Sequence, residues 1–447
     1  MTKSNGVSDG PSSREIELSL ERIRALAAQG QLLSAEVALR ALVQQHAGLT
    51  EAWMMLAELA EHRGDAEQAM ACVRQARDGQ PDEPELGLQL AEWQARAGQL
   101  AEAVATIEQV LQLHPQHFVA WLALGEALEL AGRPELAARA RFQGVNRGQK
   151  AGYLLNMQST PSAWQPVIGR IIAQVNAAHQ HCVDEALADL RGRFGAVELK
   201  RVDRAAAGYL RREQHAPPNP HQAPKFFFFP GLPDGPYHDP YLHPWTHTLV
   251  DAWQQIRAEA QALLHTEGAL EDFLGFKAGQ STEGYLGGAG PKPAWDAFFF
   301  YRHGQVYESN HQRAPKTSAL LKAADLCHVA GQAPEVCFSV LQPGTHLMPH
   351  YGVTNTRLVM HLPLIVPPDC ALNVLGEGVH EWREGVPMMF DDSFQHEAWN
   401  RSDRPRMILL MDCWNPHLSA IEREATRHLI EQISTFENIE PGGLLSA

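Results

Sequence analysis

Histidines and arginines recur within short runs of alternating apolar and polar residues in the last third of the chain. One run, GTHLMPHYGVTNTRLVMHLPLIVP, covers residues 344–367, and a second, MMFDDSFQHEAWNRSDRPRMILLMDCW, covers residues 388–414. Alternation interrupted by glycine-rich turns is typical of antiparallel strands. Because side chains alternate between the two faces of a strand, one face of the first run is predicted to carry Arg357, Val359 and His361, and the other Leu358, Met360 and Leu362.

The second run adds further polar groups to such a face. His396 contributes an imidazole, and by the same parity Arg406 shares a face with Ile408, Leu410 and Asp412. Imidazole and guanidinium groups thus gather among apolar neighbours. Burying cations destabilises a fold unless an anion or a metal ion meets them. The pattern therefore predicts a binding site.

These runs are similar to the aspartyl/asparaginyl beta-hydroxylases. The similarity lies in the run from His346 to Pro367, in FDDSFQHE, and in RMILLMDCWNP, and it is traceable more weakly back to about Lys225. It implies an oxygenase on a double-stranded beta-helix that uses Fe(II), 2-oxoglutarate and O2. It further implies that iron binds to His350 and His396, and that the 2-oxoglutarate site contains Ser339, His361 and Arg406, with Trp295 nearby.

The residue types agree with an iron site. Iron(II) oxygenases usually offer two histidines and one carboxylate, which leaves positions open for the keto acid and O2. The carboxylate usually stands two residues after the first histidine, but here His350 is followed by Gly352, which has no ligand to give. The family shares this departure, with water taken to occupy the vacant position. The alternative is a degenerate, metal-free site. Asp391 and Asp392 either orient a ligand or form a turn.

Two positively charged residues compete for the distal carboxylate of 2-oxoglutarate. Arginine suits this role because its planar donors meet both carboxylate oxygens. Arg406 lies on the strand after His396, whereas Arg404 precedes Pro405 and is expected in the turn. His361 is predicted to donate to the same cosubstrate; the alternative is a hydrogen-bonded core histidine.

The chain departs from the family pattern where the substrate would bind. Animal members carry R-x-R-x-H on this strand, and the second arginine is associated with gripping the substrate's carboxylate. Here Arg357 is kept but Val359 replaces the second arginine, and Cys337 replaces a lysine that precedes the serine. Valine forms no ion pair, so we expect Arg357 alone to meet a substrate carboxylate.

Composition limits the possible partners. The chain has 447 residues, 45% of them hydrophobic, and a net charge of −15. This charge argues against binding to nucleic acid or to an anionic membrane surface, which needs clustered Lys and Arg. No apolar run reaches the ~20 residues that span a bilayer, and the first residues lack a signal-peptide core. Six dispersed cysteines fit a reduced cytoplasm.

The first third of the chain repeats itself. Glycines at 30, 64, 98 and 132 are spaced by 34 residues, and each has an alanine five positions later. This resembles the tetratricopeptide repeat, in which small residues let paired helices pack closely and glycine ends the first helix. Such a stack is expected to form a concave surface for an extended peptide or protein partner. The alternatives are self-association and stabilisation of the oxygenase.

The predicted fold is therefore a multidomain α + β chain. It consists of an all-α repeat solenoid followed by a jelly-roll oxygenase domain with flanking helices. The predicted segments are a disordered N-terminus (1–14), repeats (15–150), a helical connector (151–224), the jelly-roll domain (225–416) and a final helix and tail (417–447).

The leading hypothesis is a dioxygenase that hydroxylates an Asp- or Asn-like side chain of a peptide or protein presented by the repeats. In that reaction 2-oxoglutarate is decarboxylated to succinate and CO2. Loss of the second arginine keeps a free amino acid or another small molecule open as the substrate. The alternative from another class is a repeat scaffold fused to a ligand-binding jelly roll without catalysis.

Overall fold

The computed structural model describes residues 13–214, 216–275, 284–289 and 293–445, and it divides into two compact units. The first unit is Met1–His179 with Thr435–Ala447, and the second is Gln180–Ser434. Two helices, α9 (Gln165–Phe194) and α15 (Ala420–Glu437), contribute residues to both. Most of the segment predicted to be disordered, residues 1–14, lies outside the described residues, and α1 begins at Ser13.

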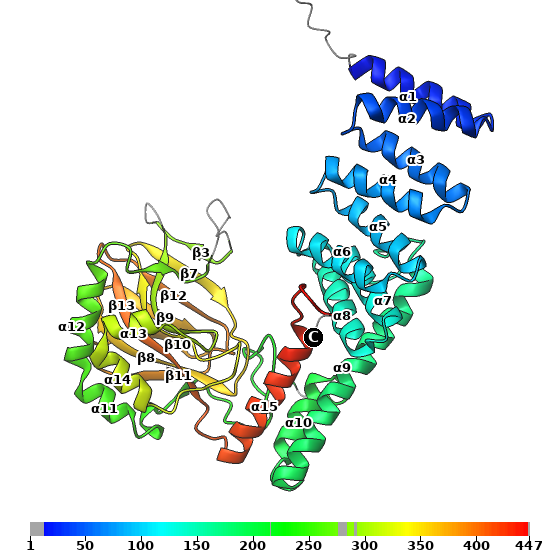
Figure 1. Cartoon of the computed structure of the whole chain (residues 1–447). Coiled ribbons are helices and arrows are strands. Elements are labelled where there is room, and N and C mark those ends of the chain that lie inside the picture. The colour runs from blue at the N-terminus through cyan, green and yellow to red at the C-terminus, as the bar shows by residue number, and fades with distance from the viewer. Residues whose placement is uncertain (1–12, 215, 276–283, 290–292, 446–447) are drawn as a thin grey trace, which may run out of the picture. The chain divides into compact units, whose positions relative to one another are not determined.

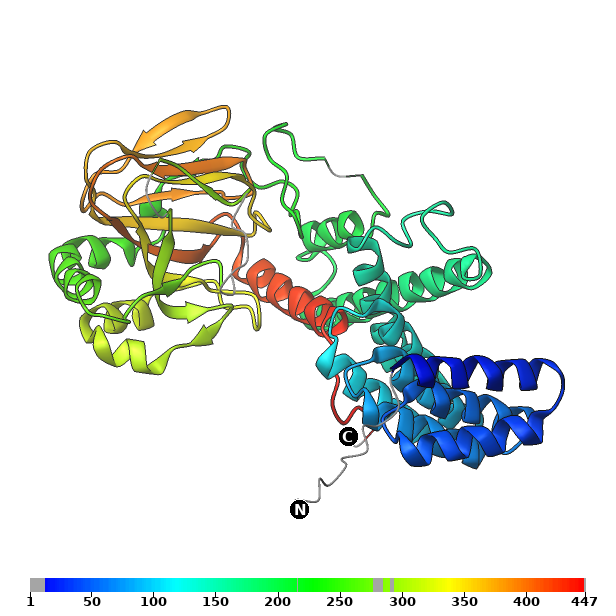
Figure 2. The same cartoon turned by 90° about the horizontal axis from the view of Figure 1, so that it is seen from above.

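The second unit is built on two antiparallel sheets, whose layers are visible in Figure 2. The eight-stranded sheet has the order β1-β11-β8-β13-β6-β4-β2, with β5 paired to β4, and the five-stranded sheet has the order β10-β9-β12-β7-β3. From β6 to β13 the chain passes repeatedly between the sheets, as a double-stranded beta-helix requires. The strands are β1 (Tyr237–His238), β2 (Glu271–Asp272), β3 (Leu286–Gly287), β4 (Trp295–Arg302), β5 (Gln305–Val306), β6 (Val336–Leu341), β7 (Thr345–His350), β8 (Arg357–Ile365), β9 (Cys370–Val374), β10 (Gly378–Glu381), β11 (Met388–Phe390), β12 (His396–Asn400) and β13 (Arg406–Trp414).

Strand parity separates the two faces of the larger sheet. On β8, Leu358, Met360 and Leu362 belong to an outer core that also includes residues of the flanking helices. Val359 belongs instead to an inner core shared with the five-stranded sheet. Arg357 and His361 have the same parity as Val359, and both line the pocket described below. The predicted division of this strand into an apolar outer face and a polar inner face is therefore confirmed.

Short helices cover the outer face of the larger sheet. Leu249, Ile256 and Leu263 pack there, on a helical stretch that is divided in two after Asp251. A separate core joins the end of α9 to α10 and α15. The helical elements of this unit are α10 (Lys200–Tyr209), the 3-10 helix η1 (Pro240–Leu242), α11 (Thr246–Asp251), α12 (Trp253–Leu264), α13 (Glu308–Arg313) and α14 (Pro315–Ala323), seen in Figure 1.

Two further features concern the membrane and the cysteines. None of the helices in the described residues is long and apolar enough to cross a membrane. All six cysteines fall in the described part of the chain, and none of them forms a disulfide there.

The first unit contains four helical pairs, drawn blue to cyan in Figure 1. They are α1 (Ser13–Ala28) with α2 (Leu32–Gln45), α3 (Thr50–His62) with α4 (Ala66–Gly79), α5 (Pro84–Arg96) with α6 (Leu100–Leu113), and α7 (Phe118–Leu130) with α8 (Pro134–Lys150). The four periodic glycines all follow the first helix of a pair at φ between 73° and 78°, where a side chain would be strained. The matching alanines are buried. The predicted repeat pattern is confirmed.

Glycine also allows close helix contact inside the third repeat. Gly87 lies in α5, and a Cβ added there would overlap Cγ2 of Val110 in α6. Valine is stiff in a helix and cannot rotate away easily. The two helices therefore touch at a point where only hydrogen fits.

We predict that Gly87→Ala destabilises the repeat unit by about 1–3 kcal/mol through overpacking, although alanine favours helix formation by up to about 1 kcal/mol. Gly169→Ala is the matched control, because Gly169 is exposed in α9 with open space around its Cα; it should be neutral or stabilising. Thermal unfolding of both variants, followed by circular dichroism, measures their stability relative to the parent chain. Equal stability for Gly87→Ala and the parent would contradict the close contact.

Candidate active site

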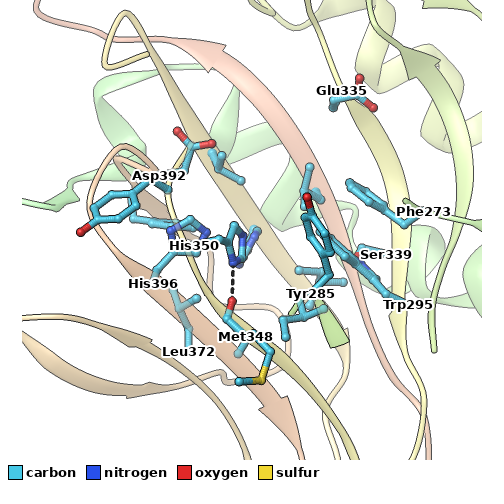
Figure 3. A pocket seen from close by; sticks show the side chains of 18 of the residues that line it. Phe273, Tyr285, Trp295, Glu335, Ser339, Met348, His350, Leu372, Asp392 and His396 are labelled. Atoms are coloured by element: carbon cyan, nitrogen blue, oxygen red, sulfur yellow. Dashed lines mark hydrogen bonds between the residues drawn. The ribbon is translucent and has the colours of Figure 1, made fainter. Parts of the chain in front are cut away.

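A pocket of ≈ 550 Å³ opens on the inner face of the larger sheet and on the five-stranded sheet. Its lining includes every residue that the sequence analysis assigned to iron, cosubstrate or substrate. Figure 3 shows the two histidines close together, Asp392 beside them, and Ser339 and Trp295 across the pocket. The fold thus brings the whole predicted set into one cavity.

The two predicted iron ligands are cross-strand neighbours. His350 ends β7, His396 begins β12, and the two residues are directly paired in the sheet register. Their ring centroids are 4.1 Å apart. Burial lowers the pKa of both imidazoles, that of His396 to about 3. Both rings are therefore neutral near pH 7, the form that a metal ligand needs.

Hydrogen bonds fix the tautomer of both rings in the same way. Nδ1 of His350 lies 2.8 Å from the carbonyl oxygen of Met348, and Nδ1 of His396 lies 2.9 Å from that of Phe394. A carbonyl only accepts, so each Nδ1 carries the proton and donates. Each Nε2 then keeps its lone pair for a ligand. The donor set therefore fits one transition-metal ion.

Asp392, in the connection between β11 and β12, occupies the space that a side chain at residue 352 would need. A side chain at Gly352 would overlap the carboxylate of Asp392. The two residues are also joined by a backbone hydrogen bond of 2.6 Å from Gly352 to Asp392. Burial raises the pKa of Asp392, an effect opposed by Arg357 and His350. Its Oδ1 is buried and has no hydrogen-bond partner among the described residues. A glycine at 352 is thus required to make room for Asp392.

No group of three or more His, Cys, Asp or Glu side chains placed to hold a metal occurs in the described part of the chain. The two imidazoles are therefore the groups at this site that a metal would have to use.

Arg406 is an unusual buried cation. It begins β13 and is 2% exposed, and no carboxylate among the described residues pairs with it. Its guanidinium lies 4.7 Å from the ring of Trp382 and donates weakly, at 3.4 Å, to the carbonyl oxygen of Ser339. Its Nε has no partner among the described residues, and burial lowers its pKa to about 10. A buried guanidinium without a carboxylate partner would be stabilised by an anionic ligand.

The rival residue does not reach the cavity. Arg404 is largely exposed, at 68%, in the turn before β13, and its nearest carboxylate is that of Asp403 at 4.0 Å. It does not line the pocket. The expected position of Arg404 in the turn is confirmed.

His361 presents a donor to the pocket. Its Nδ1 accepts a hydrogen bond of 3.3 Å from Nε1 of Trp382. Burial and the nearby charge of Arg406 keep its pKa well below the usual value, so the ring is neutral. The single proton therefore sits on Nε2, which is left free to donate.

Ser339 and Trp295 form the opposite wall. Nε1 of Trp295 donates to Oγ of Ser339 at 2.9 Å, which leaves the serine hydroxyl hydrogen available to a ligand. Phe273 stacks on Trp295 with centroids 3.6 Å apart and planes 8° apart, and holds the indole in place.

Arg357 is already paired with carboxylates. It forms an ion pair with Asp412 and lies 3.8 Å from Asp392. Burial on its own lowers the pKa of Arg357, but the attraction of these two aspartates raises it overall. Val359, its neighbour on the same face, is apolar and buried. The expectation that Arg357 alone meets a substrate carboxylate therefore faces two competing carboxylates from the chain itself.

Several pocket residues carried no recognisable signal in the sequence. Trp382, which contacts both His361 and Arg406, stands in a segment that reads only as turns. Lys225 is an exposed cation that lines the pocket, and Tyr285 lies in a glycine-rich stretch. Outside the pocket, His346 lies 2.7 Å from the carboxylate of Glu397.

Comparison with known proteins identifies both parts of the chain. Residues 250–416 match the family described as Aspartyl/Asparaginyl beta-hydroxylase, and residues 20–84 and 84–127 match tetratricopeptide-repeat families. The chain therefore carries a domain of the aspartyl/asparaginyl beta-hydroxylase family, preceded by tetratricopeptide repeats. The predicted resemblance is confirmed.

Three curated relatives illustrate the match. The human aspartate beta-hydroxylase domain-containing protein 2 is 34% identical over 46% of this chain and 54% of its own length. The mouse aspartyl/asparaginyl beta-hydroxylase is 37% identical over 30% of this chain and 18% of its own length. The ornithine lipid ester-linked acyl 2-hydroxylase of Rhizobium tropici is 31% identical over 41% and 62%. The chain thus spans less than two thirds of each of these relatives.

We predict that Gly352→Asp fails to add an iron ligand and instead destabilises the domain by about 1–3 kcal/mol, because its side chain would overlap the Asp392 carboxylate. Gly352→Ala separates steric overlap from added charge. The exchange Gly352→Asp with Asp392→Gly removes the overlap and should recover stability. Thermal unfolding with and without Fe(II) under anaerobic conditions measures both effects. A Gly352→Asp variant of parental stability with tighter metal binding would contradict the steric argument.

Proposed function

We propose that the chain is an Fe(II)- and 2-oxoglutarate-dependent hydroxylase. The supporting observation is that the neutral imidazoles of His350 and His396, each with Nε2 available, share one pocket with the guanidinium of Arg406. This guanidinium is buried, and no carboxylate among the described residues neutralises it. A metal and a dianionic keto acid together meet both needs. When bound, iron and 2-oxoglutarate supply the activation of O2, with succinate and CO2 as the products of the cosubstrate.

Each side chain has a role in holding these groups. His350 and His396 would hold the metal, and Arg406 would meet the distal carboxylate of 2-oxoglutarate through its planar donors. Ser339 and His361 would add hydroxyl and Nε2–H donors from the neighbouring strands β6 and β8. The carboxylate of Asp392 points into the same space with Oδ1 free among the described residues, so it can accept a hydrogen bond from a ligand beside the imidazoles.

Apolar and aromatic residues would exclude water from the reacting atoms. Phe390 lies against two imidazoles of the pocket, with its ring centroid 5.2 Å from that of His396 and 5.3 Å from that of His361. Trp382 covers the far side of His361 and the face of Arg406. A dry site strengthens the interactions between its charges and protects reactive species from bulk water.

The substrate we favour is a peptide or protein side chain. Tetratricopeptide repeats are surfaces that bind extended peptides, and a pocket of ≈ 550 Å³ accommodates one side chain beside the cosubstrate. A carboxylate on such a side chain would find Arg357 already paired with aspartates and Val359 apolar. Lys225 also lines the pocket, is exposed, and is not paired with either of the aspartates that neutralise Arg357. We infer that Lys225 is the cation that meets an acidic substrate.

A small apolar substrate is the second candidate. It is favoured by Val359, Leu372 and Phe390, which make the inner wall apolar where the animal enzymes are expected to carry a second arginine. The Rhizobium tropici relative is named as a hydroxylase of an ester-linked acyl group, and such a group would suit an apolar wall.

The test is iron-dependent release of succinate from 2-oxoglutarate, run separately with a host peptide pool and with a lipid extract. Mass spectrometry follows a gain of one oxygen that depends on 2-oxoglutarate. His350→Ala and His396→Ala should each abolish coupled turnover while leaving thermal unfolding near the parental value, because two protein ligands hold the metal and neither is dispensable. Succinate release that survives in either variant would refute the ligand assignment. Metal-independent binding of 2-oxoglutarate without turnover would favour a non-catalytic ligand-binding domain.

Arg406→Met should raise the 2-oxoglutarate concentration required for half-maximal turnover about 30-fold or more, since removing one partner of a desolvated charge pair costs about 2–5 kcal/mol. Methionine keeps the length of the side chain without the charge, so the cofactor-free chain should unfold at the same or a higher temperature. Arg404→Met, in the exposed turn, is the control and should change neither quantity. A fall in stability with an unchanged 2-oxoglutarate requirement would assign Arg406 a structural role.

A further inference from the structure

A segment of the chain itself occupies the surface of the repeat unit. Residues 438–445, which follow α15, lie against α6 and α8 within the first unit, as the dark red trace near the label C in Figure 1 indicates. The principal contact is made by Glu108, a residue of α6 that is 6% exposed. The segment thus behaves as a peptide bound to the repeats.

Glu108 holds the backbone of this segment. Its carboxylate accepts three hydrogen bonds from consecutive N–H groups, those of Gly442 and Gly443 at 3.0 Å and that of Leu444 at 2.9 Å. Successive N–H groups that converge in this way form a concave anion-binding nest. The nest depends on glycine, because φ is 146° at Gly442 and 74° at Gly443, where other residues are strained.

Two further contacts also go to main-chain atoms. Arg139 of α8 donates to the carbonyl oxygen of Asn438 at 2.9 Å, and Gln143 of α8 donates to that of Glu437. These hydrogen bonds therefore contact the main chain, from the last residue of α15 onward, and not the side chains of the segment.

Apolar side chains supply the rest of the contact. Ile439 is 7% exposed and belongs to the core of α5 to α8, against which Leu444 and Leu445 also pack. The bound sequence is thus a glycine pair with aliphatic residues on both sides.

The position of Glu108 is difficult to explain by stability alone. Its neighbours Ile107, Val110 and Leu111 are buried and apolar, so the helix places a carboxylate within its core face. An apolar residue there would stabilise the repeats at least as well, since a buried charge must be matched by donors. The carboxylate does, however, make the surface selective for a backbone that presents several N–H groups at once.

We propose that the surface formed by Glu108, Arg139 and Gln143 is a peptide-binding site, which the segment 438–445 occupies in cis and which a peptide from another protein occupies in trans. The partner it fits is a peptide whose glycine pair lets the backbone turn three consecutive N–H groups toward Glu108, with aliphatic side chains on both sides of the pair. Binding of such a partner displaces the chain's own segment. This proposal stands independently of the hydroxylase activity.

A substitution in the segment can free the site while leaving Glu108, Arg139 and Gln143 unchanged. In the full chain, Gly443→Pro removes one N–H group and cannot adopt φ near 74°, because the proline ring fixes φ at about −65°. A labelled synthetic peptide, ENIEPGGLL, copies residues 437–445. We expect it to bind the Gly443→Pro chain about tenfold or more tighter than the parent chain, whose own segment competes.

Matched variants locate the contact. Glu108→Gln, added to Gly443→Pro, should weaken the peptide about tenfold or more, because the lost charge served three hydrogen bonds. Glu102→Gln, at an exposed position of the same helix, should not. A peptide with N-methylglycine at the position of Gly443 should lose affinity to a similar degree.

Three outcomes overturn the proposal. The first is equal peptide affinity with and without Glu108, and the second is no binding to a Gly443→Pro chain that unfolds as cooperatively as the parent. The third is a parent dimer that Gly443→Pro dissociates, which would make a second copy of this chain the occupant. Should Gly443→Pro fail to fold, hydrogen exchange in the parent chain decides. Excess peptide must accelerate exchange of the amides of residues 442–444, and unchanged exchange refutes displacement.

Discussion

The unneutralised guanidinium of Arg406 is the constraint on which the catalytic unit depends. Every residue of β13 is buried, so the side chain at its start cannot reach water. The same sheet contains a second, mostly buried guanidinium, that of Arg357 at 14% side-chain exposure, which the chain neutralises with Asp412 and Asp392. One cation is thus balanced by the protein and the other is left for a ligand. This difference separates a structural ion pair from a binding position more clearly than residue type does.

The arrangement around His350 and His396 also depends on which charged groups the chain pairs with one another. Both rings donate Nδ1–H to the carbonyl oxygen of the residue two positions earlier in the chain, so their orientation needs no carboxylate behind them. Asp392 is therefore free to stand beside the imidazoles, where Gly352 leaves it space. A carboxylate attached at residue 352 and one at residue 392 cannot coexist, and this chain has the second.

Sequence alone predicted the features that depend on periodicity. The 34-residue spacing of glycines identified the repeats, because glycine is needed at φ above 70° after each first helix. Alternation along β8 and β13 identified the inner face, because strand parity is fixed by the backbone. The position of His350 opposite His396 was beyond such reasoning, since pairing between β7 and β12 depends on register across 46 residues, from 350 to 396. The role of Trp382 was also hidden, because a lone tryptophan among turn residues shows no periodic pattern.

A buried charge also marks the binding surface of the repeats. Sequence analysis placed peptide binding on the concave side of the stack, whereas the structure seats a peptide segment on α6 and α8, the second helices of their repeats. The residue responsible, Glu108, occupies a position where helical periodicity favours an apolar side chain. Such a departure from the pattern has no local explanation, since its partners are backbone groups more than 330 residues away in the chain. Arg406 and Glu108 are thus two buried charges without a side-chain counter-ion among the described residues. Backbone N–H groups of this chain satisfy the carboxylate of Glu108, whereas Nε of Arg406 has no such partner in the described part of the chain.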